Sequence, residues 1–119
     1  MVSSSMTSQE IEACIKACLD CHQVCTEMVM HCLKQGGEHV EPSHIQAMLD
    51  CAEICQTSAH FMLRRSPLHG RTCEVCAEAC ERCASECGRF DDERMKACAD
   101  ACRTCARACR DAAPIALAA

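Results

Sequence analysis

Aromatic side chains are nearly absent from this 119-residue chain, which has no tryptophan, no tyrosine and only two phenylalanines, Phe61 and Phe90. Aromatic rings usually supply much of the apolar area in a protein core. Half of the residues count as hydrophobic, but cysteine and alanine provide much of that share. A conventional core of aliphatic and aromatic side chains would therefore be thin.

Three further absences each exclude a class of protein. No apolar stretch approaches the roughly 18–20 residues needed to span a membrane. The net charge is −5 with both signs intermixed, so there is no basic patch for nucleic acid. Residues 1–12 have no basic segment followed by an apolar one, as a secretory leader would. We therefore expect a cytoplasmic protein with neither a nucleic acid nor a membrane as partner.

Cysteine is what the chain has in abundance, with sixteen residues, nearly all of them at heptad spacing. Steps of three and four residues place side chains in one stripe along one face of a helix. The stripes read Cys14, Cys18, Cys21, Cys25, Met28 and Cys32, then His44, Met48, Cys51, Cys55, Ser58 and Met62, then Cys73, Cys76, Cys80, Cys83 and Cys87, and finally Cys98, Cys102, Cys105 and Cys109. The spacing predicts a helical interior lined with thiols.

Capping patterns divide the chain into four helices, expected over residues 9–35, 43–65, 67–87 and 91–112. The expected caps are Thr7, Ser43, Ser66 and Asp91. Short connections make successive helices antiparallel neighbours. We therefore expect an all-α fold, an up-down-up-down antiparallel four-helix bundle over residues 9–112 with a thiol-lined core. Residues 1–8 are expected to form a disordered tail, and residues 113–119 a second tail.

A disulfide scaffold is disfavoured, because cytosolic thiols stay reduced. Cysteines three or four apart on a helix also have Cβ atoms about 5–6 Å apart, whereas a disulfide needs about 3.8 Å. Soft thiolates instead favour Cu(I), zinc or iron–sulfur clusters. Zinc and iron–sulfur sites usually lie on turns and loops, so a continuous helical ladder favours Cu(I). Each monovalent ion that enters displaces one proton, and a buried core therefore stays near neutral.

Four segments carry a resemblance to a known family: EACIKACLDC, LDCAEIC, CEVCAEACERCASECG and CADACRTCARACR. In these segments the chain resembles the copper storage proteins, which are cysteine-rich four-helix bundles, over about residues 9–112. The resemblance implies cytosolic storage and detoxification of multiple Cu(I) ions inside the bundle, and commonly a homotetramer. The stripe departs from the family pattern at Met28 and Ser58.

The helices should bring His44, Met48, Met28, Met95 and Cys32 to one end of the bundle. Imidazole and thioether groups bind Cu(I) more weakly than thiolates do, so they suit an uptake port. We count these side chains, with all sixteen cysteines, as candidate metal ligands. His69 and Met62 lie at the opposite end and are candidates for a second uptake port there.

Other polar and apolar side chains are expected to have structural roles. Three histidines lie off the stripe and one lies in a loop, and we expect surface or seam positions for His22, His31, His60 and His39. Ser58 should bond a backbone carbonyl one turn back. An apolar edge should pack between helices, with some members left for an oligomer interface: Ile15, Leu19, Val29, Leu33, Ile45, Leu49 and Leu63.

Two other functions remain as alternatives: a zinc or general heavy-metal buffer, and a thiol redox sensor or enzyme. The latter would need a few exposed thiols with a low pKa. The sequence shows no catalytic arrangement, so we expect no enzyme. The expected partners are copper ions, copper-donating thiols or a copper chaperone, and further copies of the chain.

Overall fold

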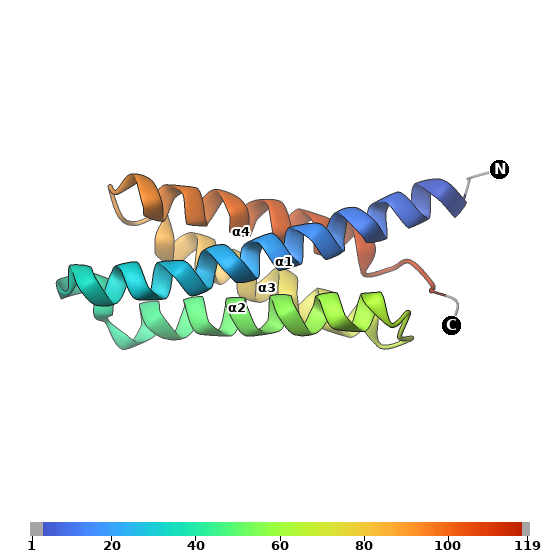
Figure 1. Ribbon diagram of the computed structural model, residues 1–119, viewed down its shortest axis with the longest axis horizontal. Helices are drawn as coiled ribbons and strands as arrows, with labels where there is room; N and C mark the ends of the chain where they lie inside the picture. The colour runs from blue at the N-terminus through green and yellow to red at the C-terminus, as the bar shows by residue number, and fades with distance from the viewer. Residues whose placement is uncertain (1–3, 118–119) are drawn as a thin grey trace.

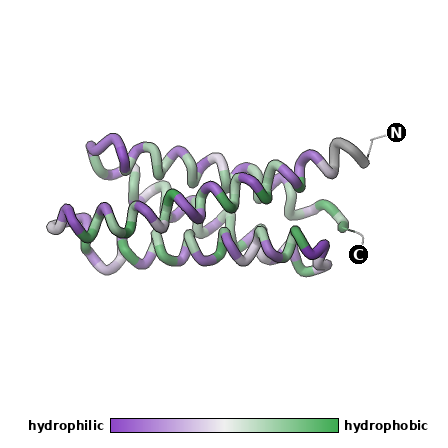
Figure 2. Tube along the Cα trace, in the orientation of Figure 1, coloured by the Kyte–Doolittle hydropathy of each residue, from purple (hydrophilic) through white to green (hydrophobic). Residues whose placement is uncertain are grey.

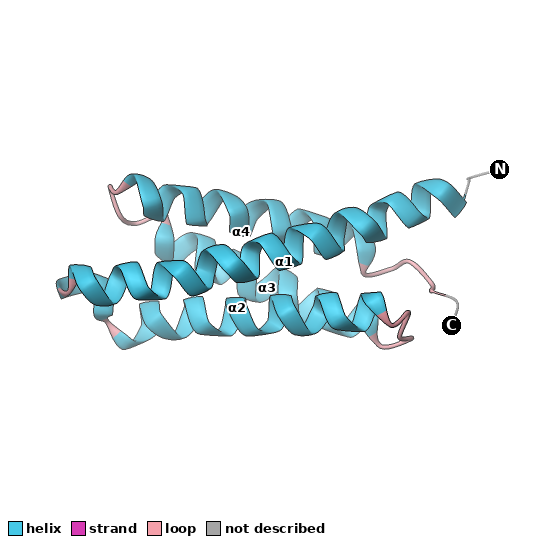
Figure 3. Cartoon of the chain, viewed as in Figure 1, coloured by secondary structure: helices cyan, strands magenta, loops and turns pink. Residues whose placement is uncertain are grey.

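The computed structural model describes residues 4–117, and four long helices dominate it (Figures 1 and 3). The elements are α1 (Ser4–Gln35), the short 3-10 helix η1 (Gly37–Val40), α2 (Pro42–Leu63), α3 (His69–Cys87) and α4 (Glu93–Ala112). Within the described residues there is no strand. The predicted all-α four-helix bundle is confirmed.

The helices form an elongated bundle that measures 52 × 20 × 17 Å. Helices α1 and α3 each pack against both α2 and α4. We call the end that holds η1 and the start of α2 the His44 end, and the end that holds the start of α3 the Cys73 end. The chain enters and leaves the bundle at the Cys73 end (Figure 1). Among the described helices, none combines the length and hydropathy that a membrane crossing requires.

Apolar and polar residues alternate around each helix with helical periodicity, as the colouring in Figure 2 shows. Small residues flank the cysteine stripes inside the bundle. Buried alanines do this on three helices: Ala52, Ala59, Ala77, Ala84, Ala99 and Ala106. Their small side chains let the helices approach one another closely, so that the thiols meet along the axis.

Two helix starts differ from the sequence prediction on the N-terminal side of the chain. Helix α1 begins at Ser4, so the expected disordered tail is wrong for residues 4–8, and residues 1–3 lie outside the described residues. Helix α2 begins at Pro42 with Glu41 as N-cap rather than Ser43. Proline has a φ already set for the first helical position, which explains the earlier start.

The starts of α3 and α4 also differ from the predicted residues. Helix α3 begins at His69 rather than residue 67, because residues 66–68 form a turn in which the Leu68 N–H donates to Ser66 Oγ at 3.1 Å. Helix α4 is capped by Asp92 rather than Asp91, through Oδ1 contacts with the backbone N–H groups of Arg94 and Met95. Asp92 has the extended backbone that an N-cap needs.

Helix α2 ends at Leu63, two residues before the expected end. Arg65 adopts a left-handed conformation with φ of 57°. The Ser66 N–H then donates to the Phe61 carbonyl and the Arg65 N–H to that of Met62, which satisfies the last carbonyls of the helix. After α4, residues 113–117 are not helical, and Ile115 and Leu117 pack against the core.

Candidate metal centre

All sixteen cysteines lie inside the bundle, with no exposed surface and with free thiols. Every cysteine except Cys32 and Cys73 belongs to one continuous network with Sγ–Sγ distances of 3.6–4.0 Å. We call this network the thiol column. A disulfide has an S–S length of about 2.05 Å, so these are contacts between separate thiols.

The column contains overlapping groups of cysteines whose sulfurs lie within 4.8 Å of one another. One group takes a thiol from each helix: Cys21, Cys55, Cys80 and Cys105. Three further groups of four are Cys18, Cys76, Cys105 and Cys109; Cys21, Cys25, Cys51 and Cys102; and Cys25, Cys83, Cys98 and Cys102. A group of three, Cys14, Cys73 and Cys109, joins Cys73 to the end of the column. Several cysteines belong to two groups. Such sharing suits ions joined by bridging thiolates better than isolated sites.

Helix α2 contributes differently from the other three helices. It supplies only Cys51 and Cys55 to the column, and Met48, Ser58 and Met62 continue its stripe toward the two ends. All five side chains are fully buried. The heptad pattern therefore places thioether and hydroxyl groups at the ends of the column and thiols along its middle.

At the His44 end, Cys32 has a thioether and an imidazole as neighbours. Its Sγ lies 3.3 Å from His44 Nε2 and 3.6 Å from Met95 Sδ. Met48 is fully buried and Met28 is 5% exposed. Cys32 therefore contacts both His44 and Met95 at this end.

The second ring nitrogen of His44 faces an acidic side chain. Nδ1 lies 3.5 Å from Glu86 Oε1, and Glu86 also pairs with Arg89 at 2.9 Å. Among the described side chains, His44 Nδ1 is the buried nitrogen or oxygen atom that lacks a hydrogen bond, since this contact is long. Burial lowers the pKa of His44, and Glu86 partly opposes that shift. The ring is therefore neutral at physiological pH, and a proton on Nδ1 would leave the Nε2 lone pair facing Cys32.

At the Cys73 end, the corresponding histidine has other partners. His69 Nε2 lies 3.1 Å from the Ala112 carbonyl, and Nδ1 lies 3.3 Å from that of Ser66. Both ring nitrogens thus face backbone oxygens, so the structure does not present His69 as a ligand. Met62 Sδ does lie 3.7 Å from Cys73 Sγ. The second uptake port considered in the sequence analysis therefore has no imidazole nitrogen directed toward Cys73.

Ser58 does not make the contact predicted from the sequence. Its hydroxyl lies 3.4 Å from Cys73 Sγ and 3.3 Å from Thr72 Oγ1. The expected bond to a carbonyl one turn back is wrong, because α3 brings two polar partners across the seam. Ser58 therefore connects α2 to α3 beside the last thiol.

The protonation of the thiols follows from burial and from contacts between thiols. Burial raises the pKa of Cys32 to about 11, and the charge of Asp92 adds to this shift. Inside the column, contacts with Cys102 and Cys105 lower the pKa of Cys21, whereas the contact with Cys21 raises that of Cys102. Because an uncompensated buried thiolate is unfavourable, the column as a whole stays close to neutral until a cation arrives.

The four histidines expected at surface or seam positions divide into two groups. His22 Nδ1 lies 2.8 Å from the Ala52 carbonyl, in the seam between α1 and α2, and His60 is exposed. His31 and His39 instead contact the Asp92 carboxylate, and their side chains are only 10% and 18% exposed. Sequence reasoning missed this arrangement, and it also missed Glu86 and Phe90, because no spacing rule connects residues so far apart.

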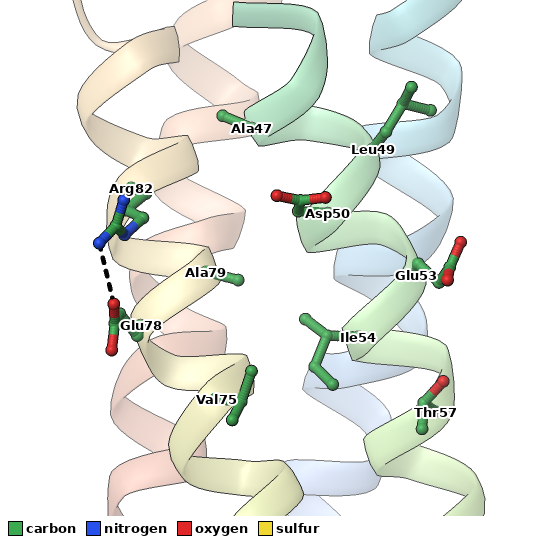
Figure 4. A pocket seen from close by; sticks show the side chains of 10 residues that line it. All are labelled: Ala47, Leu49, Asp50, Glu53, Ile54, Thr57, Val75, Glu78, Ala79 and Arg82. Carbon is green, nitrogen blue, oxygen red and sulfur yellow. Dashed lines mark hydrogen bonds and ion pairs between the residues drawn. The ribbon is translucent and has the colours of Figure 1, made fainter. Parts of the chain in front are cut away.

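A surface groove lies between α2 and α3, outside the column (Figure 4). Ile54 and Ala79 point into the space between the two helices, and Glu78 pairs with Arg82 along its rim. Its lining holds neither cysteine nor histidine nor methionine. The soft ligands of the described chain are thus concentrated in the interior.

Comparison with known proteins agrees with this geometry. Residues 7–114 match the family described as copper storage protein. The chain belongs to the copper storage protein family. It is 40% identical over 70 residues to the uncharacterized cysteine-rich protein YhjQ of Bacillus subtilis (strain 168). That match covers 59% of this chain and 65% of YhjQ, so the chain spans slightly less than two thirds of that relative.

Solved structures with the same fold include two copper storage proteins. The Nmul_A1745 protein of Nitrosospira multiformis is 47% identical with a TM-score of 0.86, over 90% of this chain and 97% of that one. Cu(I)-bound copper storage protein BsCsp3, from Bacillus subtilis, is 39% identical with a TM-score of 0.82, over 87% and 98%. A cytosolic copper storage protein from Streptomyces lividans, with five coppers, is 28% identical with a TM-score of 0.80, over 93% and 98%.

Proposed function

We propose that this protein stores multiple Cu(I) ions as thiolate complexes inside its bundle and thereby limits the toxicity of free copper. The observation that carries the proposal is the continuous thiol column. It offers soft ligands along the whole axis and shields them from solvent. Membership of the copper storage family and the likeness to Cu(I)-bound BsCsp3 support the same function.

Charge favours a monovalent cargo. Unpaired charge inside a protein is strongly unfavourable, so a buried site must stay close to neutral. One Cu(I) for each deprotonated thiolate leaves no net charge in the column. A zinc ion held by four thiolates leaves negative charge, and a series of such sites would accumulate it.

Zinc storage is the second candidate, because one distance favours it. Sulfurs around tetrahedral zinc lie about 3.8 Å apart, given a Zn–S length of about 2.3 Å. The column has Sγ–Sγ distances of this size, for example 3.7 Å between Cys21 and Cys51. Stoichiometry separates the two candidates, since zinc should saturate near one ion for four cysteines.

We propose no catalytic role. A reactive thiol needs solvent access and a pKa that is low because of nearby positive charge. The cysteines here have no exposed surface and have other thiols as neighbours. The redox-sensor alternative therefore has less support than storage.

We propose that copper enters at the His44 end. Neutral His44, Met48 and Met95 can take Cu(I) without first losing a proton, as a thiol must. Cys32, in contact with His44 and Met95, would then receive the ion and pass it to the column. Met28 completes this set of candidate ligands.

We further propose a cytoplasmic location, loading by copper-donating thiols or a copper chaperone, and assembly into a homotetramer. A reducing compartment would keep the thiols available for metal. The Streptomyces relative is described as cytosolic. For self-association, the α2–α3 groove offers Leu49 and Val75, which are 51% and 57% exposed.

The test is an anaerobic Cu(I) titration of the reduced chain, followed by metal analysis after gel filtration. We expect saturation near one ion for each cysteine. A variant should show reduced capacity with helical content retained, since its changes reach every four-cysteine group: Cys18→Ser, Cys25→Ser, Cys55→Ser, Cys76→Ser, Cys83→Ser and Cys102→Ser. Unchanged capacity in this variant, or saturation at a quarter of the cysteine count, would reject Cu(I) storage in the column.

A further inference from the structure

Three polar side chains meet beside the His44 end without belonging to the thiol column. His31 Nε2 lies 2.9 Å from Asp92 Oδ2, and His39 Nε2 lies 3.2 Å from the same oxygen. The imidazole centroids of the two histidines are 5.9 Å apart. The residues come from three separate segments: α1, η1 and the N-cap of α4.

We propose that His31, His39 and Asp92 form a binding site for a divalent transition-metal ion such as Zn²⁺, separate from the copper store. Imidazole nitrogen and carboxylate oxygen are ligands that Zn²⁺ accepts, whereas Cu(I) prefers the sulfurs of the column. Water would complete the coordination.

The distances suit such an ion. Zinc holds nitrogen and oxygen ligands at about 2.0–2.2 Å, which places neighbouring ligands of a tetrahedron roughly 3.3–3.5 Å apart. The two nitrogen–oxygen distances are within a few tenths of an ångström of that spacing. Small side-chain movements would therefore open room for the ion.

The carboxylate can serve two purposes at once. Asp92 Oδ1 caps α4, and Oδ2 is turned toward the imidazoles. A carboxylate only accepts hydrogen bonds, so in this structure each Nε2 presents an N–H. Metal binding requires the other tautomer, with the proton on Nδ1 and the lone pair on Nε2. Partial exposure of the three side chains, 28% for Asp92, gives solvent access for water ligands.

An ion at this site would fasten the segments that surround His44. The His39 ring lies 4.2 Å from that of Phe90, and the Phe90 ring lies 4.8 Å from that of His44. Helix η1 would then be fixed beside the copper ligands. Binding of a divalent metal ion at this site would therefore make the His44 end more rigid.

The experiment first fills the thiols with Cu(I), removes unbound metal, and then adds Zn²⁺. We expect one extra Zn²⁺ per chain by metal analysis. In ¹H–¹⁵N spectra of the imidazoles, the Nε2 resonances of His31 and His39 should shift while that of His60 stays in place. Absence of the extra ion, or unshifted resonances of His31 and His39, would overturn the proposal.

Matched variants distinguish metal binding by His31 and His39 from their hydrogen bonds to Asp92. His31→Gln and His39→Gln keep an N–H donor for Asp92 but replace a good zinc ligand with a poor one. Each should weaken Zn²⁺ binding at least about tenfold, about 1.4 kcal/mol, while the control His60→Gln binds as the wild type does. Wild-type affinity in both cluster variants would contradict the assignment.

Failure of the proposed copper storage would appear separately, at the loading step. If the thiols took up no Cu(I), the Zn²⁺ titration would be run on the reduced chain with the same imidazole resonances as the readout. Shifts at His31 and His39 would then support the divalent site, and their absence would reject it.

Discussion

The two ends of the bundle have nearly the same soft residues but differ in what those residues contact. Each end has a buried histidine, a methionine and a final cysteine. At one end His44 Nε2 faces the Cys32 thiol at 3.3 Å. At the other, both nitrogens of His69 face backbone carbonyls. Residue type alone therefore does not make a ligand; the direction of the ring nitrogens does.

The Cys73 end is also closed by packing. Ile11, Met62 and Ala112 are fully buried there, and Ile115 packs against the same core. Gly70 lies so close to the end of α4 that an added Cβ would meet the Ala113 carbonyl oxygen at 2.7 Å. We call this packed end the seal. His44, Met48 and Met95 are equally buried at the other end, so the proposed uptake port differs from the seal in the atoms that face its last cysteine.

Truncation of the seal should have the largest effect on stability. Ile11→Ala removes a fully buried side chain and leaves a cavity, so we expect unfolding to become easier by about 2–4 kcal/mol. Urea unfolding of the reduced chain measures this change. The control Leu19→Ala, on the same helix but 40% exposed, should lose much less. Copper loading should keep its rate in both variants, and a slower rate with Ile11→Ala would break the contrast between seal and port.

Variants at the proposed uptake port of the His44 end should instead change the rate of copper loading. Replacement of His44 by alanine and Met48 by leucine removes neutral ligands ahead of the column, so Cu(I) loading should slow about tenfold, about 1.4 kcal/mol in the barrier. Final capacity should stay nearly intact. Stopped-flow absorbance of the copper–thiolate bands gives the rate.

The matched change at the other end is His69→Ala with Met62→Leu, which should leave loading unchanged. If that variant loaded as slowly as the first, copper would enter at both ends and the comparison would fail.

Acid should loosen the His44 end before the Cys73 end. A hydrogen bond from His31 lowers the pKa of Asp92 from 3.8 to about 2. Because the folded-state pKa is the lower one, the stabilisation is present above pH 4 and is lost as the pH falls toward 2. At neutral pH, Asp92→Ala should cost about 1 kcal/mol through the lost cap.

Unfolding of the wild type and the Asp92→Ala variant between pH 7 and pH 2 tests this prediction. The difference in stability between them should shrink as the pH falls below 4. A difference that stays constant down to pH 2 would show that the charge of Asp92 does not support this end.

The sequence was enough to predict the bundle and the burial of the cysteines. A heptad stripe fixes which side chains face inward, and the stripe depends only on local helical geometry. Helix ends were harder to predict, because neighbouring residues compete for the cap. Asp91 and Asp92 are chemically alike, and only the folded chain shows that Asp92 has the extended backbone and the two N–H contacts.

Contacts between segments far apart in the chain could not be predicted in this way. His31, His39 and Asp92 meet only because the folded chain brings side chains of α1, η1 and the N-cap of α4 together. Likewise, the partners of Ser58 lie on α3, and those of His69 lie at the end of α4 and in the preceding turn. Periodicity gives the face of a helix, whereas the partner of a polar atom depends on the packing of whole helices.

The smallest effect should come from the acidic neighbour of His44. Glu86→Gln removes the charge that faces Nδ1 at 3.5 Å but keeps an oxygen that can accept a hydrogen bond. Carboxylates behind metal-binding histidines fix the tautomer, and their loss commonly costs tenfold or more. Because this contact is long and an acceptor remains, we expect loading to slow by less than about tenfold. The control Glu78→Gln removes an exposed carboxylate from the same helix and should have no effect. An unchanged rate with Glu86→Gln would mean that His44 presents Nε2 to copper without help from Glu86, and that the direction of the ring is set by its packing against Phe90 alone.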